Sequence, residues 1–286
     1  MHVPVLSREV LEHLALRPEG IYLDATAGLG GHTGQIASRL TTGFVVANDR
    51  DAESLELAKR NTAEWADRIR FHHGPFSRVD QALSVARVER VDGLLADLGV
   101  SRYQLTEGAR GFSLQADGPV DMRMDRTQET SAFEILNYAA EKELADLIFG
   151  FGEERRARRI ARAIVQARPI RSTLQLAGLV EKAVPRTGRL HPATQTFMAL
   201  RIAVNREMEE LDAFLDLLPK LVKTGGRIVI LTFMSLEDRK VKLKFRELAK
   251  QATLRILTKH VVRPAEQEVR DNPASRSAML RAAERT

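Results

Sequence analysis

Short apolar runs alternate with amphipathic stretches over roughly the first hundred residues of the chain. The apolar runs predict strands, because they are short and rich in branched residues, whereas the stretches between them show the spacing of helices. The predicted strands are 21–23, 44–48, 69–71 and 91–97, and the predicted helices start near His32 and cover 36–40, 52–65 and 79–85. Strands that alternate with helices imply a parallel sheet with right-handed crossovers.

The pattern changes in the middle of the chain. Residues 105–126 are rich in Gly, Asp and Arg, and the following stretch has only helical periodicity. The helices predicted there are 131–137, 140–149, 153–168, 172–184 and 192–217. Strand patterns return at 227–232, 254–257 and 277–282, with a helix over 236–250. We therefore predict an α/β domain formed by residues 1–106 and 214–286, interrupted by an all-helical insertion, residues 107–213.

Composition narrows the class of protein. The chain of 286 residues is 44% hydrophobic, carries a net charge of +6 and contains no cysteine. The missing cysteines exclude disulfides, zinc–thiolate sites and a cysteine nucleophile. No apolar stretch is long enough to span a bilayer and no signal peptide is recognisable, so we expect a cytoplasmic protein that has no membrane association. The basic charge favours a nucleic-acid partner, although many soluble enzymes are equally basic.

A glycine-rich turn follows the first predicted strand. Residues 23–32 read Leu-Asp-Ala-Thr-Ala-Gly-Leu-Gly-Gly-His, and Asp49 ends the next strand. Glycines let the backbone approach a ligand closely, and a carboxylate at the second strand end suits the hydroxyls of an adenosine ribose. A dinucleotide fingerprint requires a third glycine where this chain has Thr33. A pyrophosphate also gains little from the nearby Asp24, whereas a sulfonium ion tolerates or welcomes that carboxylate. S-adenosylmethionine is therefore favoured, and a tight turn without a ligand is the alternative.

Two further strand ends carry candidate chemistry. Phe76 follows the third strand and is either a packing surface for adenine or a core aromatic residue. Asp97 ends the fourth strand, where a reacting methyl group would lie, and its alternative role is a helix cap. Asp117 and Asp121 lie in the loop 108–125, which is either functional or a structural Arg–Asp network.

Basic side chains of the insertion are candidates for RNA binding. Four arginines lie close together near the start of the helix predicted over 153–168, whose acidic first turn would suit the helix dipole. The residues assigned to RNA are Arg155, Arg156, Arg158, Arg159, His191 and Arg201. Arginine suits phosphate recognition, but such a cluster is equally compatible with a solvated helix face. His191 has no partner at a metal-ligand spacing, and we expect no metal site.

Many ordered motifs together make the chain resemble a known family. It resembles the bacterial S-adenosylmethionine-dependent methyltransferases that modify N4 of a cytidine in 16S ribosomal RNA, and the likeness covers nearly the whole chain. The motifs that carry it include Gly28-Leu29-Gly30-Gly31-His32, Asn48-Asp49-Arg50-Asp51, His73-Gly74-Pro75-Phe76-Ser77, Asp97-Leu98-Gly99-Val100-Ser101, Asp117-Gly118-Pro119-Val120-Asp121-Met122-Arg123-Met124, Gly152-Glu153-Glu154-Arg155, His191-Pro192-Ala193-Thr194 and Asn272-Pro273-Ala274-Ser275-Arg276-Ser277.

The resemblance implies a fold, a cofactor and a substrate. The fold is a Rossmann-like class I methyltransferase sheet with the inserted helical domain for substrate recognition. The cofactor contacts implied are Gly30, Gly31, His32, Asp49, Phe76, Asp97 and Gln104. The implied substrate is cytidine 1402, in conventional rRNA numbering, within the 30S subunit or a late assembly intermediate. The oligomeric state stays open, and a homodimer is one of the alternatives.

The chain departs from the family at three places. Ser101-Arg102-Tyr103-Gln104 replaces Ser-Ser-Pro-Gln, Met234 replaces a histidine, and the segment between residues 250 and 263 is shorter than in many relatives. These changes concern rate or RNA contacts rather than the cofactor site.

The chemistry of a cytosine amine explains why an acid is expected near the methyl group. Its lone pair is delocalised into the ring, so an acceptor for one N–H would localise it and take the proton. Asp97 is the first candidate, and Asp117 or Asp121 is the second.

Two rival functions are a nicotinamide-dependent oxidoreductase, against which Thr33 argues, and an RNA-binding assembly factor with a vestigial cofactor fold. Intact Gly30, Gly31, Asp49 and Asp97 argue against that factor.

Overall fold

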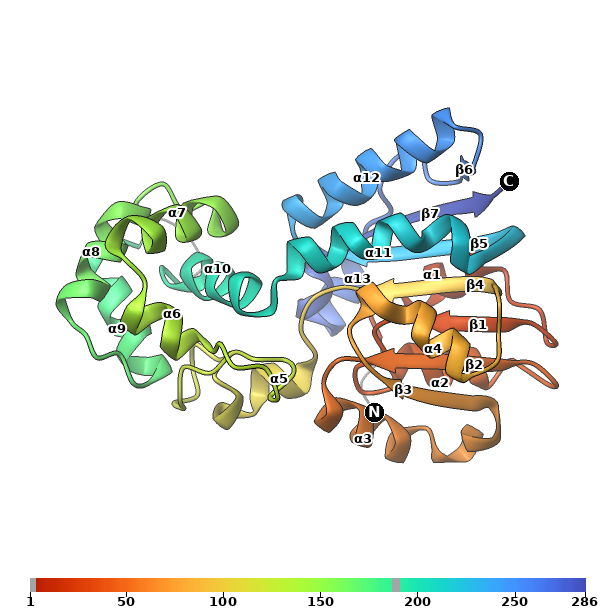
Figure 1. Cartoon of the computed structure of the whole chain (residues 1–286), viewed down its shortest axis with the longest axis horizontal. Coiled ribbons are helices and arrows are strands. Elements are labelled where there is room, and N and C mark those ends of the chain that lie inside the picture. Colours follow the sequence, from red (N-terminus) through yellow and green to blue (C-terminus); the bar gives the residue numbers. More distant parts are fainter. Residues whose placement is uncertain (1–3, 187–190) are drawn as a thin grey trace. The chain divides into compact units, whose positions relative to one another are not determined.

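The computed structural model describes residues 4–186 and 191–286, which form two compact units (Figure 1). The α/β unit contains the chain up to Gly99 and from Glu209 onward, and the helical unit is Val100–Met208. The predicted boundaries, at 106/107 and 213/214, fall later in the chain. The second boundary lies inside the continuous helix α11, Glu207–Leu221, so helical periodicity gives no signal at that point.

The α/β unit is built on a seven-stranded sheet within the described residues. Its strands are β1 Ile21–Asp24, β2 Phe44–Asp49, β3 Ile69–His73, β4 Val91–Asp97, β5 Val222–Thr232, β6 Leu254–Ile256 and β7 Met279–Arg285. The order is β3-β2-β1-β4-β5-β7-β6. Strands β1 to β5 are parallel, as the alternating pattern predicted, and β7 is antiparallel to both of its neighbours.

Apolar side chains project from both faces of the sheet, and helices cover each face (Figure 1). In β2, Val46 packs on one face whereas Val45 and Ala47 pack on the other, as expected for a strand buried on both sides. The first face is covered by α4 Val79–Val85, α11 and α12 Ser235–Lys250. The second face is covered by α1 Ser7–Leu14, α2 Gly31–Ala37 and α3 Ala52–Asn61.

Short elements complete this unit. They are the 3-10 turns η1 Ala63–Arg68, η2 Phe76–Arg78 and η4 Pro273–Ser277, and the helix α13 Glu266–Asp271. The sequence pattern predicted neither α1 nor α13. Among the described residues, none of the helices has the length and apolar content needed to cross a membrane.

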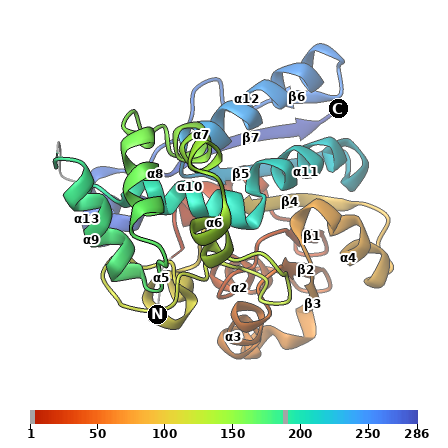
Figure 2. The same cartoon turned by 60° about the vertical axis from the view of Figure 1, so that its left-hand side comes forward.

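The helical unit has its own core, and Figure 2 shows its helices from a second side. These are α5 Arg102–Thr106, α6 Ala132–Tyr138, α7 Glu141–Gly152, α8 Ala157–Gln166, α9 Thr173–Ala183 and α10 Thr194–Asn205, with the 3-10 turn η3 Gly108–Arg110. Within the described part, an isolated bridge between Pro119 and Ser172 is the single β-type pairing of this unit.

Two helix predictions in this region were wrong. The helix predicted over 192–217 is two helices, because Arg206 has a left-handed backbone, with φ 49°, and ends α10 before α11 begins. The helix predicted over 153–168 begins only at Ala157, because Glu153, with φ 53°, ends α7. Glu153 and Glu154 therefore do not form an acidic first turn for α8. Non-glycine residues in left-handed conformations leave no clear sequence signal.

Candidate functional site

Three carboxylates end three neighbouring parallel strands of the α/β unit. Asp24, Asp49 and Asp97 are the last residues of β1, β2 and β4, and β1 pairs with both other strands. Ligands of open parallel sheets bind outside the carboxyl ends of the strands. The structure thus brings together at one sheet edge the two predicted acids, Asp49 and Asp97, with Asp24.

Asp49 is held by backbone amides on both sides. Its Oδ2 atom accepts a hydrogen bond from the Gly28 amide at 2.7 Å, and its Oδ1 atom accepts one from the Asp51 amide at 2.8 Å. Burial raises the pKa of Asp49 to about 6 and outweighs the two hydrogen bonds, which favour the ionised form. Each oxygen keeps a second lone pair, so the carboxylate can also accept hydrogen bonds from a ligand.

Asp51, two residues later, has a different role. It is fully buried and is the N-cap of α3, where its side chain accepts hydrogen bonds from the amides of Glu53 and Ser54. Of the two acids near the end of the second strand, Asp51 is therefore a structural cap, and only Asp49 stays a candidate for the site.

The glycine turn is shaped by close packing against α3. Gly30 has φ +83°, and a Cβ atom there would lie 2.9 Å from Cγ2 of Thr62 and 3.2 Å from the Cα atom of Ala58. Both the backbone conformation and the lack of space require glycine at this position. Gly31 is the first residue of α2 and packs against Pro4.

His32 and Asp97 supply unpartnered buried polar atoms. The side chain of His32 is buried, and among the described residues neither ring nitrogen has a hydrogen-bond partner. Its Nε2 atom lies 3.6 Å from Oδ2 of Asp97, and the buried Oδ1 atom of Asp97 has no hydrogen-bond partner in the part of the chain that the structure describes. Buried polar groups are almost always hydrogen-bonded, so these atoms point to a ligand or water in the complete site.

The scaffold beneath these residues includes two polar groups that the sequence interpretation did not assign. The hydroxyl of Thr26 accepts a hydrogen bond from the Asp97 amide at 2.6 Å. The buried Asn48 side chain donates to the carbonyls of Ala25 and Gly74, which ties two strand-end loops together. An asparagine inside an apolar strand was the available signal for this second role.

Asp24 is buried, and it accepts hydrogen bonds from the Thr33 hydroxyl at 2.6 Å and the Thr26 amide at 3.2 Å. Burial raises its pKa, and nearby Asp97 adds to this effect. Thr33, which stands where a dinucleotide site has glycine, is thus a partner of this carboxylate.

The two remaining predicted cofactor residues differ in their surroundings. Phe76 is half-buried and packs edge-to-face on Phe214, with ring centroids 5.4 Å apart. Gln104 belongs to the helical unit, where its side-chain carbonyl accepts a hydrogen bond from the Ser101 amide at 2.9 Å and so caps α5.

Asp117 and Asp121 have structural partners inside the helical unit. Asp117 accepts hydrogen bonds from the amides of Gly118 and Leu174, and a hydrogen bond from Ser172 lowers its pKa most. Asp121 forms a two-pronged ion pair with Arg123, at 2.7 and 3.0 Å. The hydrogen bonds and charge of Arg123 outweigh burial and lower the pKa of Asp121.

The predicted RNA-binding residues fall into two groups. Arg155, Arg158 and Arg159 are exposed and have no side-chain partner among the described residues, and the exposed Arg156 contacts the Pro185 carbonyl at 3.4 Å. Arg201, in contrast, forms a bidentate ion pair with Glu207. Its Nε and Nη2 atoms each donate a hydrogen bond at 2.8 Å to one oxygen of that carboxylate.

The side chain of Arg201 is 14% exposed and that of Glu207 is 8% exposed, so this pair belongs to the interior of the unit. His191 is half-buried; its Nδ1 atom accepts a hydrogen bond from the Ala193 amide, and its Nε2 atom lies 3.9 Å from Glu181. Within the described ranges, no three acidic or histidine side chains cluster closely enough to hold a metal ion.

The sheet order with an antiparallel seventh strand, together with an acid at the ends of β1, β2 and β4, defines a Rossmann-like class I methyltransferase domain. The cofactor of this class is S-adenosylmethionine. The sequence model of the MraW methylase family matches residues 1–286, and the chain belongs to that family.

Individual relatives cover almost the whole chain. It is 64% identical over 284 residues to the ribosomal RNA small subunit methyltransferase H of Solibacter usitatus, covering 99% of each protein. It is 47% identical over 286 residues to the protein of the same name from Cyanothece sp., covering 100% of this chain and 95% of that one. Among solved structures, a SAM-dependent O-methyltransferase from Thermotoga maritima matches with 12% identity and a TM-score of 0.46, over 100% of this chain and 68% of that one.

Proposed function

We propose that this methylase transfers a methyl group from S-adenosylmethionine to N4 of a cytidine in the decoding region of 16S rRNA, cytidine 1402 in conventional numbering. The observation that carries the proposal is the buried Oδ1 atom of Asp97, which has no hydrogen-bond partner within residues 4–186 and 191–286 and lies at the edge where the cofactor of this fold binds. The names of the relatives, which specify the RNA of the small ribosomal subunit, support the class of substrate.

The cofactor fits the charges and the polar groups at this edge. Asp24, Asp49 and Asp97 make the edge acidic, which favours a bound sulfonium cation. The ionised Asp49 accepts hydrogen bonds from the ribose hydroxyls, because both of its oxygens keep a free lone pair. The unpartnered nitrogens of His32 offer further polar contacts.

The other predicted cofactor residues have supporting roles. Gly30 lets the turn pack closely against Thr62 and Ala58 of the α3 region, and Gly31 lets it pack against Pro4, so the two glycines fix the shape of the turn beside the strand ends. Phe76 offers its half-buried ring to the adenine, and the buried Gln104 maintains the capped start of α5.

The chemistry needs a group that accepts a proton from the cytosine amine. When bound, S-adenosylmethionine supplies a methyl carbon that its sulfonium charge activates toward displacement. The free Oδ1 atom of Asp97 accepts one N–H of the amine, which localises the nitrogen lone pair and places an acceptor for the proton that must leave. His32, whose Nε2 atom lies 3.6 Å from the second oxygen of Asp97, orients this carboxylate through a bridging water.

Asp117 and Asp121, the second candidates, are less suited to this role. The hydrogen bonds and ion pair described above hold both carboxylates and lower their pKa values, which makes them weaker proton acceptors. We therefore assign the acceptor role to Asp97 and a structural role to the other two.

The helical unit recognises the RNA in this proposal. Arg155, Arg158 and Arg159 are exposed cations without side-chain partners among the described residues, and guanidinium groups bind phosphates well. The target base has to leave its stack to reach the sheet edge, which favours an irregular RNA segment of the 30S subunit or of a late assembly intermediate. Arg201 contributes to the interior of this unit rather than to the RNA surface.

The test is methyl transfer to defined RNA. The purified protein is incubated with methyl-labelled S-adenosylmethionine and 30S subunits that lack the modification, and the digested nucleosides are identified by mass spectrometry. Label in N4-methylcytidine, or in its 2′-O-methylated form, is the expected result. The variant Asp97→Asn is expected to lower kcat about 10²- to 10⁴-fold, the usual contribution of a positioned proton acceptor.

The matched control is Asp117→Asn, which removes a carboxylate that caps a helix and is expected to keep most of the turnover. Cofactor affinity is measured separately by calorimetry, so that a loss of binding is not mistaken for a loss of chemistry. Near-normal turnover of Asp97→Asn with normal cofactor affinity would contradict the assignment of Asp97. Absence of labelled N4-methylcytidine with intact cofactor binding would contradict the proposed function itself.

A further inference from the structure

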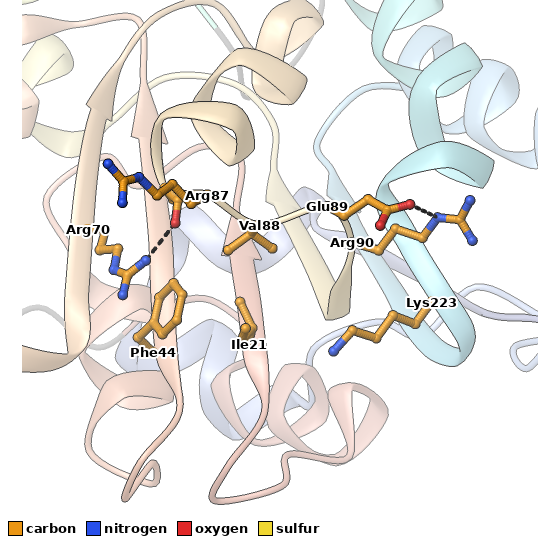
Figure 3. A pocket seen from close by; sticks show the side chains of 9 residues that line it. Ile21, Phe44, Arg70, Arg87, Val88, Glu89, Arg90 and Lys223 are labelled. Atoms are coloured by element: carbon orange, nitrogen blue, oxygen red, sulfur yellow. Dashed lines mark hydrogen bonds and ion pairs between the residues drawn. The ribbon is translucent and has the colours of Figure 1, made fainter.

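A cavity lies at the amino ends of the strands (Figure 3), whereas Asp24, Asp49 and Asp97 lie at the carboxyl ends. It has a volume of about 650 Å³, which lies in the range of small-molecule and nucleotide pockets. Its walls come from the beginnings of strands, with Ile21 starting β1, Phe44 starting β2 and Lys223 near the start of β5. The segment 86–90, which leads into β4, completes the wall.

The cavity and the acidic edge are separated by the length of the strands. Phe44 and Asp49 are the two ends of β2, and five residue steps of a strand span about 16 Å. The cavity is therefore not part of the cofactor site, and none of the three strand-end carboxylates lines it.

The cavity combines an apolar centre with cationic sides. In Figure 3, Ile21 and Val88 lie between Arg70 and Arg87 on one side and Arg90 and Lys223 on the other. Of the side chains that line it, four are cationic and one, Glu89, is anionic. This balance favours an anionic ligand that also presents an apolar surface.

Arg70 is fixed in position and exposed. Its guanidinium lies 3.6 Å from the centroid of the Phe44 ring and donates a hydrogen bond to the Ala86 carbonyl at 2.6 Å. A guanidinium stacked on an aromatic ring is a planar surface on which a nucleic-acid base can stack. Because contacts within the protein already order Arg70, little side-chain entropy is lost when a ligand binds.

Two other cations of the cavity are available for an anion. Arg87 is exposed, and its side chain has no partner among the described residues; in the same part of the chain the side chain of Arg90 has only a 4.0 Å contact with its neighbour Glu89. Lys223 is neutralised in part by Asp92, at 3.0 Å. The free positive charge therefore lies on the segment 86–90.

We propose that this cavity is a second RNA-binding site, which takes one nucleotide of a single-stranded segment outside the target base. Phosphates pair with Arg87 and Arg90, and the base stacks at the Arg70–Phe44 pair. The choice of RNA as the ligand rests on the proposed function, whereas the site itself rests on the geometry of the cavity. A substrate RNA held at both edges of the sheet would be positioned by contacts far from the methyl group.

Equilibrium binding to the full-length protein tests the site. The fluorescence anisotropy of a short labelled oligouridylate is titrated at several salt concentrations with the wild type and with Arg87→Ala/Arg90→Ala. For each phosphate that no longer pairs with an arginine, affinity is expected to fall about fivefold near 0.1 M salt, and the salt slope is expected to decrease by about 0.7. The matched control is Arg246→Ala/Lys250→Ala, which removes two exposed cations from α12, outside the cavity, and is expected to leave affinity within about twofold.

A second variant separates stacking from charge. Arg70→Lys keeps the charge but loses the planar guanidinium, so affinity is expected to fall while the salt slope stays near the wild-type value. Equal binding by Arg87→Ala/Arg90→Ala and its control would overturn the proposal. So would a wild type that binds uridine monophosphate as tightly as the oligonucleotide, because the cavity would then be a site for free nucleotides.

Methyl transfer by the same preparations distinguishes this inference from the proposed function. Cavity-dependent RNA binding without N4-methylcytidine formation would contradict the proposed reaction and leave the second site standing. Formation of N4-methylcytidine, with an RNA affinity that the cavity variants do not change, would support the proposed reaction and contradict the second RNA-binding site.

Discussion

Replacing Asp49 by asparagine is expected to change protein stability in a pH-dependent way. Burial raises the pKa of this carboxyl from 3.8 to about 6, so the folded protein binds the proton more tightly than the unfolded chain does. Ionised Asp49 therefore destabilises the fold fully above about pH 6, and this cost declines as the pH falls toward 4. The difference between the two pKa values corresponds to about 3 kcal/mol at neutral pH.

The measurement is the difference in unfolding free energy between Asp49→Asn and the wild type, obtained from urea titrations of the ligand-free protein at several pH values. Between about pH 4.5 and 7.5 this difference is expected to change by about 2 kcal/mol in favour of the variant. A constant offset is also expected, because asparagine can replace only one of the two acceptors that hold the amides of Gly28 and Asp51. The offset cancels when the two pH values are compared.

The same substitution is expected to weaken cofactor binding. Loss of one hydrogen bond to a charged group costs about 1.5–3 kcal/mol, or roughly 10- to 150-fold in Kd measured by calorimetry at pH 7.5. Asp51→Asn is the matched control, because asparagine is as good an N-cap as aspartate and Asp51 faces α3. For the wild type, cofactor affinity is expected to fall about tenfold between pH 7 and pH 5 as Asp49 becomes protonated.

A stability difference that does not change with pH would refute the reasoning about the burial of Asp49. Undiminished cofactor affinity in Asp49→Asn, with the same affinity in Asp51→Asn, would refute its role at the ribose.

Three other substitutions have clear expected outcomes. Gly30→Ala puts a Cβ atom 2.9 Å from Thr62 at φ +83°, so a loss of about 1–3 kcal/mol in unfolding free energy is expected, together with weaker cofactor binding in calorimetry. Arg201→Ala leaves its buried carboxylate partner unpaired and is expected to cost about 3–5 kcal/mol in urea unfolding; reduced RNA affinity at normal stability would instead identify an RNA contact. Arg155→Glu/Arg159→Glu is expected to weaken RNA binding and flatten its salt dependence at unchanged melting temperature, and an unchanged salt slope would rule this contact out.

Local sequence patterns were sufficient for the parallel part of the sheet and for the residues that end its strands. Strand β4 and the turn after β1 were predicted close to their observed places, because an apolar run ending in an acid and a run of glycines are local signals. The helix ends at Glu153 and Arg206 were not predicted, since left-handed residues other than glycine carry no such signal.

The residue types of the candidate site were predicted from the sequence, but the role of each residue was not. The sequence alone determined that acids follow three strands and that a glycine turn lies beside them. Only the tertiary structure decided that Asp51 caps a helix while Asp49 faces the site, and that Arg201 pairs with Glu207. The cavity at the opposite edge is lined by residues from separate parts of the chain, among them Phe44, Arg70, the segment 86–90 and Lys223. No local sequence pattern predicts that these residues lie close together. Partners distant in sequence are set by packing, whereas strands, turns and their ends are set by neighbours along the chain.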